Sequence, residues 1–367
     1  MLMALPASLA LLQTRSERPR NRVQSRLSVH CDSSEASTVS RDALPAQYPN
    51  ISVDSYPAND PVEDRFNVLT SEAGLDILSI YDGHGGYVVA DYASKNLPSL
   101  LRQNIGKNQI NDEKLVNKAI NDSFSAIEAV YVDTIKDSYK LGFGGLASVG
   151  SCVLTLLRKG NNVVIANLGD CRAVMGTASE VTTNMHVATR LTRDHNARVA
   201  LEALLMEWNH PNEDPSKLIV CKNAHACYVK GRLQLTKALG DLYLKHHEFN
   251  AREGVHRSLG RRIPEPYSPP YVGNVPDIFH ITIDRNDKFV ILATDGVWDF
   301  LSDQEAVNIV SSCPNKADAA KTIVEEVLSR AARECGVTVQ ELKAMPAGRH
   351  RRSRHDDTTV LVYYTRT

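Results

Sequence analysis

The chain has 367 residues, 43% of them hydrophobic, which suits a packed core in one large domain or two small ones. Its 42 basic and 43 acidic residues nearly cancel, so bulk charge does not favour nucleic acid or a membrane surface as the main partner. No run of about 18 apolar residues occurs, which argues against a membrane-spanning helix.

The first 30 residues carry five arginines and a single acid, Glu17, behind an apolar leading half. This composition predicts an organelle transit peptide, most simply mitochondrial, with a disordered tail as the alternative. A Ser-rich linker follows, so residues 1–45 are interpreted as transit peptide and linker, and residues 46–367 as the folded domain. The predicted location is the mitochondrial matrix, and the alternative is the cytoplasm.

Strands are predicted where β-branched and aromatic residues cluster, at 75–82, 150–158, 161–169, 277–284, 288–295 and 358–364. Helical spacing predicts helices at 87–103, 112–136, 303–312 and 316–335, the third opened by a capping box of Ser302 and Glu305. The turn sequence KGNN predicts an antiparallel hairpin between 150–158 and 161–169. Because βαβ alternation is absent, we expect an α+β fold with helices packed on antiparallel sheets. A variable surface subdomain is expected around 198–275.

The seven cysteines are scattered, odd in number and contain no CxxC pair, which favours reduced thiols over a disulfide framework. Cys221, His225 and Cys227 lie close in sequence, but their spacing is too loose to predict a metal site.

Carboxylates follow or adjoin several apolar segments, often beside glycine, which allows a sharp turn and a close backbone approach. They are Glu63 and Asp64 in PVEDRF, Asp82 in YDGHGG, Asp170 in NLGDCRAV, Asp295 and Asp299 in ATDGVWDF, and Asp356 and Asp357 in RHDDTTVLV. A single Asp-Gly pair is usually a turn. Because acidic residues follow several apolar segments in the same chain, the pattern instead indicates a cluster that binds hard divalent cations such as Mg²⁺ or Mn²⁺.

The ordered motifs PVEDRF, YDGHGG, GSCVLTLL, NLGDCRAV, LTRDHNA, LQLTKALGD, ATDGVWD and HDDTTVLV resemble the metal-dependent protein phosphatases of the 2C type. The likeness covers about residues 50–365. NDPVEDR, HPNEDPS and GRLQLTKALGDLYLK look most similar to the pyruvate dehydrogenase phosphatase-like branch. The resemblance implies two packed antiparallel sheets flanked on both outer faces by helices, and a serine/threonine phosphatase whose substrate is a phosphoprotein, with a pyruvate dehydrogenase subunit as one expectation.

The resemblance also implies a role for each acid. Asp82 would bridge two ions, Mg²⁺ or Mn²⁺, with the Gly83 carbonyl as a further ligand; Glu63 and Asp64 would hold one ion, and Asp295 and Asp356 the other. Asp170 and Asp299 stand where the family binds a weaker third ion. A metal-bridging hydroxide would attack phosphorus directly, and His84 matches the general acid that protonates the leaving oxygen.

One departure concerns the substrate phosphate. Many relatives carry an arginine four residues before the glutamate of the first motif, where this chain has Asn59. Asn lacks the bidentate, charge-assisted grip of Arg. Arg65 is the nearest candidate to supply that charge, with a surface role as the alternative. Lys237 and Asp241, in TKALGD, are interpreted as structural because Gly240-Asp241 reads as a turn that closes a strand.

Two rival functions stay open. An inactive pseudophosphatase scaffold on the same fold would be expected to have lost ligand acids, yet Asp64, Asp82, Asp295 and Asp356 are all present. A phosphohydrolase of small phosphate esters would share both fold and metals, because fold does not dictate substrate.

Overall fold

The computed structural model describes residues 48–70, 74–105, 109–179, 185–223, 226–250 and 262–366. The predicted transit peptide and linker at 1–45 lie outside these ranges, as do residues 251–261 of the predicted surface subdomain. None of the described helices combines the length and the apolar character that a membrane span requires.

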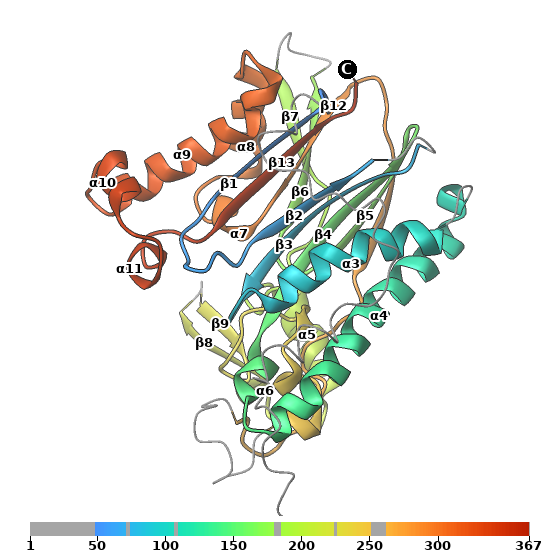
Figure 1. Cartoon of the computed structure of the whole chain (residues 1–367), viewed down its shortest axis with the longest axis vertical. Coiled ribbons are helices and arrows are strands. Elements are labelled where there is room, and N and C mark those ends of the chain that lie inside the picture. Colours follow the sequence, from blue (N-terminus) through green and yellow to red (C-terminus); the bar gives the residue numbers. More distant parts are fainter. Residues whose placement is uncertain are drawn as a thin grey trace, which may run out of the picture.

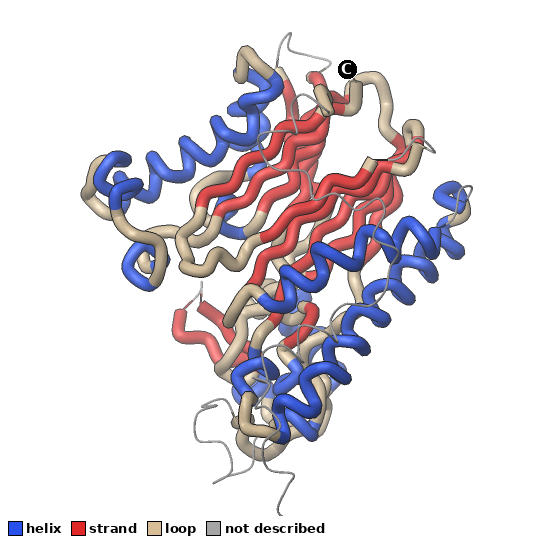
Figure 2. Tube along the Cα trace, viewed as in Figure 1, coloured by secondary structure: helices blue, strands red, loops and turns tan. Residues whose placement is uncertain are grey.

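Two antiparallel sheets lie face to face at the centre of the molecule (Figure 2). Sheet A has the strand order β1 (Ile51–Tyr56), β13 (Thr358–Tyr364), β12 (Asp287–Ala293), β6 (Arg172–Ala178) and β7 (His186–Arg190). Sheet B has the order β11 (Asp277–Thr282), β5 (Asn162–Leu168), β4 (Gly150–Lys159), β3 (Asp76–His84) and β2 (Arg65–Leu69), with β10 (Leu239–Gly240) paired to β4.

Helices cover the outer face of each sheet (Figure 1). On sheet B lie α3 (Val88–Ile105) and α4 (Glu113–Lys140), whose apolar faces share one buried cluster with Ile77 and Tyr81 of β3. On sheet A, α8 (Asp303–Ser312) and α9 (Ala319–Glu334) share another with Ile291 of β12, next to α7 (Asp295–Trp298), α10 (Val339–Ala344) and α11 (Arg349–Arg352). The predicted four layers, helix on sheet on sheet on helix, are confirmed.

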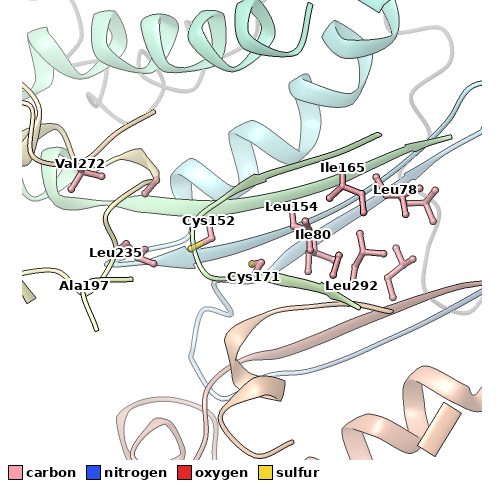
Figure 3. Close-up of a cluster of buried hydrophobic side chains, with 14 of the residues drawn as sticks. Leu78, Ile80, Cys152, Leu154, Ile165, Cys171, Ala197, Leu235, Val272 and Leu292 are labelled. Atoms are coloured by element: carbon pink, nitrogen blue, oxygen red, sulfur yellow. The ribbon is translucent and has the colours of Figure 1, made fainter. Parts of the chain in front are cut away.

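The innermost cluster lies between the sheets. Successive side chains of a strand point to opposite faces, so Leu78 and Ile80 of β3 enter this layer while Ile77 and Tyr81 face the helices. Figure 3 shows side chains of both sheets here, including Leu154 of sheet B and Leu292 of sheet A. By the same alternation, Asp82 follows Ile80 onto the face that looks toward sheet A.

The predicted local signals largely match the structure. The KGNN turn joins β4 and β5 as an antiparallel hairpin, and Ser302 and Glu305 form the reciprocal capping box at the start of α8. Predicted helix 316–335 begins instead as a short 3-10 turn, Lys316–Asp318, before α9. Strands β1, β2, β6 and β7 were not predicted, because none shows a long β-branched run.

The segment after β7 carries its own small elements at one end of the sandwich: α5 (Ala200–Asn209), α6 (Pro215–Leu218) and the hairpin of β8 (Ile219–Asn223) with β9 (Ala226–Val229) (Figure 1). Cys221 and Cys227 are directly opposite in this hairpin and form a disulfide, with Cα atoms 3.9 Å apart. The prediction of reduced thiols is therefore wrong for this pair. Sequence spacing alone could not reveal that a hairpin sets the two side by side.

Candidate metal centre and general acid

Carboxylates from both sheets meet at one end of the inter-sheet layer. Asp82 lies near the end of β3, and Asp170 follows β5, both in sheet B. Asp295 follows β12, and Asp356 precedes β13, both in sheet A. Asp82, Asp170 and Asp295 each bring one carboxylate oxygen within 4.8 Å of the others. Residues more than 200 positions apart in sequence thus form one acidic cluster.

Gly83 allows the first two motifs to touch. A Cβ at this position would lie 2.6 Å from the main-chain oxygen of Glu63, closer than side-chain atoms ever approach, so only glycine fits. This contact seats the Glu63-Asp64 segment, which leads into β2, against the end of β3. The predicted ligands Glu63, Asp64, Asp82 and Gly83 are therefore neighbours.

Asp357 fixes the loop that carries Glu63. Its buried carboxylate accepts hydrogen bonds from the main-chain N–H of Ala58 (2.5 Å), Asn59 (2.8 Å) and Glu63 (2.7 Å). Asp356, its neighbour, instead faces Asp64 and Asp295 electrostatically and pairs with Arg352. The two adjacent acids of the HDD motif therefore have different roles. Asp356 belongs to the acidic cluster, and Asp357 holds the loop that carries Glu63.

Asp170 is held by its own partners. Asn196 Nδ2 donates to Asp170 Oδ2 at 2.9 Å, and Cys152 Sγ donates to Oδ1 at 3.3 Å. Cys152 and Cys171 lie within the buried cluster shown in Figure 3. Burial raises the pKa of Cys171 to about 11, and a hydrogen bond with Cys171, together with burial, raises the pKa of Cys152 well above its usual value. Both thiols are therefore protonated packing groups at neutral pH, as expected for buried cysteines.

Crowded carboxylates dominate the electrostatics of this region. Burial, then the charge of Asp357, raises the pKa of Asp64 to about 8. Burial, then Asp170, raises the pKa of Asp295 to about 6, and burial, then Asp295, does the same for Asp299. The pKa values of Asp82 and Asp356 are also raised well above their usual range by burial and by Asp295. Ionising all of these groups together is unfavourable unless a cation compensates them.

The donor set fits a hard divalent cation. One carboxylate oxygen of Asp64 and one of Asp295 are buried and accept no hydrogen bond from the described part of the chain. Buried unsatisfied acceptors are costly, and a bound ion would satisfy them. The three clustered groups offer only oxygen, which favours Mg²⁺ or Mn²⁺ over zinc. Asp299, at the end of α7, is more exposed and stands at the rim of this cluster.

His84, two residues beyond Asp82 on β3, is paired with an acid that sequence reasoning classed as structural. Its Nε2 lies 2.7 Å from Oδ2 of the fully buried Asp241. Burial lowers the pKa of His84, but the charge of Asp241 and its hydrogen bond outweigh burial and raise it. A Cβ on Gly150 would lie 2.4 Å from His84 Nε2 and 2.2 Å from Asp241 Oδ2, so this glycine leaves room for the pair.

Asp241 is itself held in place. It adopts a left-handed backbone conformation (φ 51°) just after β10, and its N–H donates to the oxygen of Val149 at 2.9 Å. Glu128 of α4 accepts from the N–H of Gly240 at 2.9 Å and from Lys245 at 2.5 Å, both groups being buried. The turn predicted at Gly240-Asp241 is present. Its contact with His84 carried no signal in the local sequence.

The two residues predicted for the substrate phosphate have other partners in the structure. The Asn59 side-chain amide donates to Asp357 Oδ2 at 3.1 Å. The Arg65 guanidinium bonds the carboxylate of Asp91 and the main-chain oxygens of Val62 and Asp64. Two arginines outside the predicted set, Arg198 and Arg352, are exposed and lower the pKa of Asp295 and Asp299. Their positive charge therefore reaches the acidic cluster.

An ion-pair network joins the start of β6 and the loop after β7 to the helices of sheet A. Arg172 binds Asp194 through two nitrogens, at 3.1 and 2.6 Å, and Asp303 at 2.7 Å. Its guanidinium also lies 4.9 Å from the ring centre of Trp298 in α7. Because α7 begins with Asp295, this network ties the positions of Asp170 and Asp295 together.

The α-β-β-α sandwich carries a carboxylate cluster at the ends of its strands and, beside it, a histidine paired with a buried acid, an arrangement suited to metal-dependent hydrolysis of phosphate esters. Residues 63–336 match the model of the family described as protein phosphatase 2C. The chain belongs to the protein phosphatase 2C family, and it is therefore a protein serine/threonine phosphatase by family.

Two similar curated proteins come from plants. The chain is 33% identical over 307 residues to probable protein phosphatase 2C 43 of Oryza sativa subsp. japonica, covering 84% of this chain and 75% of that protein. It is 33% identical over 287 residues to probable protein phosphatase 2C 64 of Arabidopsis thaliana, covering 78% of this chain and 68% of that one.

Two solved structures share the fold. One, described as the structure of a C. elegans sex determining protein, aligns with a TM-score of 0.59 at 19% identity; it covers 86% of this chain, which spans 64% of that one. The other, serine-threonine phosphatase 2C from Toxoplasma gondii, aligns with a TM-score of 0.56 at 19% identity, covering 86% of this chain and 94% of that one. At this identity the likeness concerns the fold alone.

Proposed function

We propose that the chain hydrolyses phosphoserine and phosphothreonine in proteins, with water as the direct attacking group and His84 as the general acid. The observation that carries this proposal is the meeting of Asp82, Asp170 and Asp295 within 4.8 Å, in a chain whose His84 pairs with Asp241. The carboxylates alone would repel a phosphate dianion, so the reaction needs the cations that these acids are suited to hold.

Two divalent ions, Mg²⁺ or Mn²⁺, would supply the activation of water and the neutralisation of phosphate charge. Asp82 and the Gly83 carbonyl, Glu63 and Asp64, and Asp295 and Asp356 are the groups proposed to hold them, with Asp170 and Asp299 for a third ion. Asp357 orients the loop of Glu63, and Arg172 holds α7 and hence Asp295. These are fixed, preorganised groups, as electrostatic catalysis requires.

The protein supplies the proton. His84 Nε2 bonds to Asp241, which leaves Nδ1 free of that pairing to face a leaving serine or threonine oxygen. The charge of Asp241 raises the pKa of His84 and so favours the imidazolium, the form that a general acid needs. Asp241 is a positioning residue, because it acts on the reaction through His84.

The test is phosphate release from a phosphoserine peptide by purified protein with Mn²⁺, with Mg²⁺ and with EDTA. We expect turnover only with added metal, and its collapse in Asp295→Asn. Asp133→Asn, an acid on α4 with a 79% exposed side chain, is the matched control and should keep full activity. Folded protein that releases no phosphate with either metal would refute the proposal and favour a pseudophosphatase scaffold.

We further propose a substrate and a location. The likeness of NDPVEDR, HPNEDPS and GRLQLTKALGDLYLK to the pyruvate dehydrogenase phosphatase-like branch supports a pyruvate dehydrogenase subunit as substrate. The arginine-rich residues 1–30 support the mitochondrial matrix. Comparing rates on phosphorylated pyruvate dehydrogenase and on an unrelated phosphoprotein tests the first proposal. N-terminal sequencing of protein from isolated organelles tests the second, and an intact Met1 would contradict import.

A further inference from the structure

A largely apolar pocket opens beside the acidic cluster. Its volume is about 530 Å³, within the range of about 300–1,000 Å³ typical of ligand sites. Three segments line it, and each adjoins a residue of the proposed site: residues 59–63 end at Glu63, residues 85–88 follow His84, and residues 143–149 precede Gly150. Glu63 itself is a wall of both the pocket and the metal centre.

The pocket walls are anchored. Asp357 holds the 59–63 segment. On the opposite wall the hydroxyl of Tyr131 donates to the Leu146 oxygen at 2.7 Å, and Val149 accepts from the N–H of Asp241. Gly85 packs so closely on this wall that a Cβ there would lie 2.7 Å from the oxygen of Ser148. The walls of this open pocket are therefore fixed in place.

The lining has a definite chemistry. Tyr87, Val88, Phe143, Leu146 and Val149 supply apolar surface, and Phe143 is 51% exposed at the rim. The charged lining groups are both acidic, Asp60 and Glu63. Such a surface takes an apolar side chain and repels an acidic one.

We propose that this pocket binds a bulky apolar side chain of the phosphoprotein substrate, one or two residues away from the phosphoserine. The inference rests on the proposed function, since the pocket is assigned to the same substrate. Adjacent residues of an extended peptide are about 3.3–3.6 Å apart along the chain. A phosphoserine at the metal centre therefore brings a close neighbour to a pocket that shares the Glu63 wall. The substrate class is a phosphopeptide with Leu, Ile, Met or Phe near the phosphoserine, and without an acid there.

The experiment compares kcat and KM on three substrates: a phosphoserine peptide with leucines on both sides, the same peptide with alanines, and p-nitrophenyl phosphate. We expect a preference of about tenfold in kcat/KM for the leucine peptide, expressed mainly in KM. Phe143→Ala should bring that ratio close to one, and Phe143→Leu should retain most of it. Leu141→Ala is the matched control, because Leu141 is 72% exposed in the same connection and lies outside the lining.

Equal kcat/KM for the two peptides in the wild type would overturn the assignment, as would a preference that survives Phe143→Ala. If p-nitrophenyl phosphate and both peptides are hydrolysed without preference, the assignment of the pocket is refuted, but the proposed phosphatase activity is not. Failure to hydrolyse any of the three with either metal removes the proposed function and this inference together. Unfolding curves of the Phe143 variants check that a half-exposed residue was changed without loss of the fold.

Discussion

Replacing Asp241 by Asn isolates the contribution of this buried acid to His84. The substitution keeps the size of the side chain, and Asn tolerates the left-handed conformation that residue 241 adopts (φ 51°). It removes the negative charge that lies 2.7 Å from His84 Nε2. We therefore expect a folded protein with intact metal ligands and an impaired general acid.

The size of the effect follows from the bond that is lost. A hydrogen bond to a charged group contributes about 1.5–3 kcal/mol, and each 1.36 kcal/mol changes a rate about tenfold. The kcat for a phosphoserine peptide should therefore fall by roughly one to two orders of magnitude. That is at or below the lower end of the contribution of about 10²–10⁴ that general acid catalysis makes, as expected when His84 is weakened but still present.

The pH dependence should change as well. Asp241 is the main cause that raises the pKa of His84, whereas burial lowers it. Without Asp241, His84 loses its proton at a lower pH, and because the protonated form is the active acid, the alkaline limb of the kcat profile should move to lower pH. The profile of the wild type, measured beside it, gives the reference.

The assay compares a phosphoserine peptide with p-nitrophenyl phosphate, whose leaving group departs without protonation. We expect Asp241→Asn to lose rate on the peptide and to keep most of it on the aryl ester. An equal loss on both substrates, or an unchanged alkaline limb, would refute the role given to Asp241. Asp133→Asn again serves as the control for a neutralised acid away from the site.

Three further changes test how the site is built. Gly83→Ala should weaken metal activation and cut turnover at least tenfold, because its Cβ would lie 2.6 Å from the Glu63 oxygen. Gly273→Ala is the control and should change neither property, because Gly273 is exposed and a Cβ there would lie 3.4 Å from Lys237 Cγ. Asp357→Asn should lower the free energy of unfolding in urea by about 2–4 kcal/mol, because an amide cannot accept all of the bonds that this carboxylate receives. Mn²⁺ or Mg²⁺ at a hundredfold excess over Kd should stabilise the folded protein by about 2.7 kcal/mol and so raise its melting temperature. This stabilisation by metal should become smaller as pH falls from 8 to 5.

The sign of that last effect follows from the raised pKa values. In the metal-free folded protein the pKa of Asp64 is raised to about 8 and that of Asp295 to about 6, so folding favours the protonated form of both groups. Their contribution to stability is present below the unfolded values near 4 and is lost as pH rises through about 6 and 8. Protons therefore compete with metal at low pH. A metal-induced rise in melting temperature that grows on acidification would contradict this account. Wild-type turnover in Gly83→Ala would refute the role given to Gly83, and an unchanged urea midpoint in Asp357→Asn would refute the role given to Asp357.

Sequence patterns predicted the parts of the fold that local chemistry determines. The core strands β3, β4, β5, β12 and β13 have dense apolar runs, and their predicted limits agree with the structure within a few residues. Strands such as β7 were not predicted, because they are largely exposed and lack such apolar runs. Helix α5 was not predicted although Leu201, Leu204 and Leu205 have helical spacing, because the region around 198–275 was interpreted only as a surface subdomain; these three leucines are exposed.

The site divides in the same way. Acids at strand ends are visible in sequence, and the structure brings Asp82, Asp170 and Asp295 together. The partner of His84 was not visible, because Asp241 is 157 positions away and sits in an ordinary turn. The difference between Asp356 and Asp357 also depends on which way each side chain leaves the start of β13. Long-range pairing of this kind is fixed by the register of sheets, which one sequence does not display.

The strand order of sheet A has a consequence for synthesis. β13, at residues 358–364, lies between β1 and β12, and β1 pairs along its whole length with it (Ile51↔Tyr363 to Tyr56↔Thr358). A nascent chain on the ribosome therefore carries Asp64, Asp82 and Asp295 before the strand that closes the sheet has emerged. Until Asp356 and Asp357 follow, the loop of Glu63 lacks its anchor. Sheet A, and with it the loop of Glu63, can therefore be completed only after residues 356–364 have been synthesised.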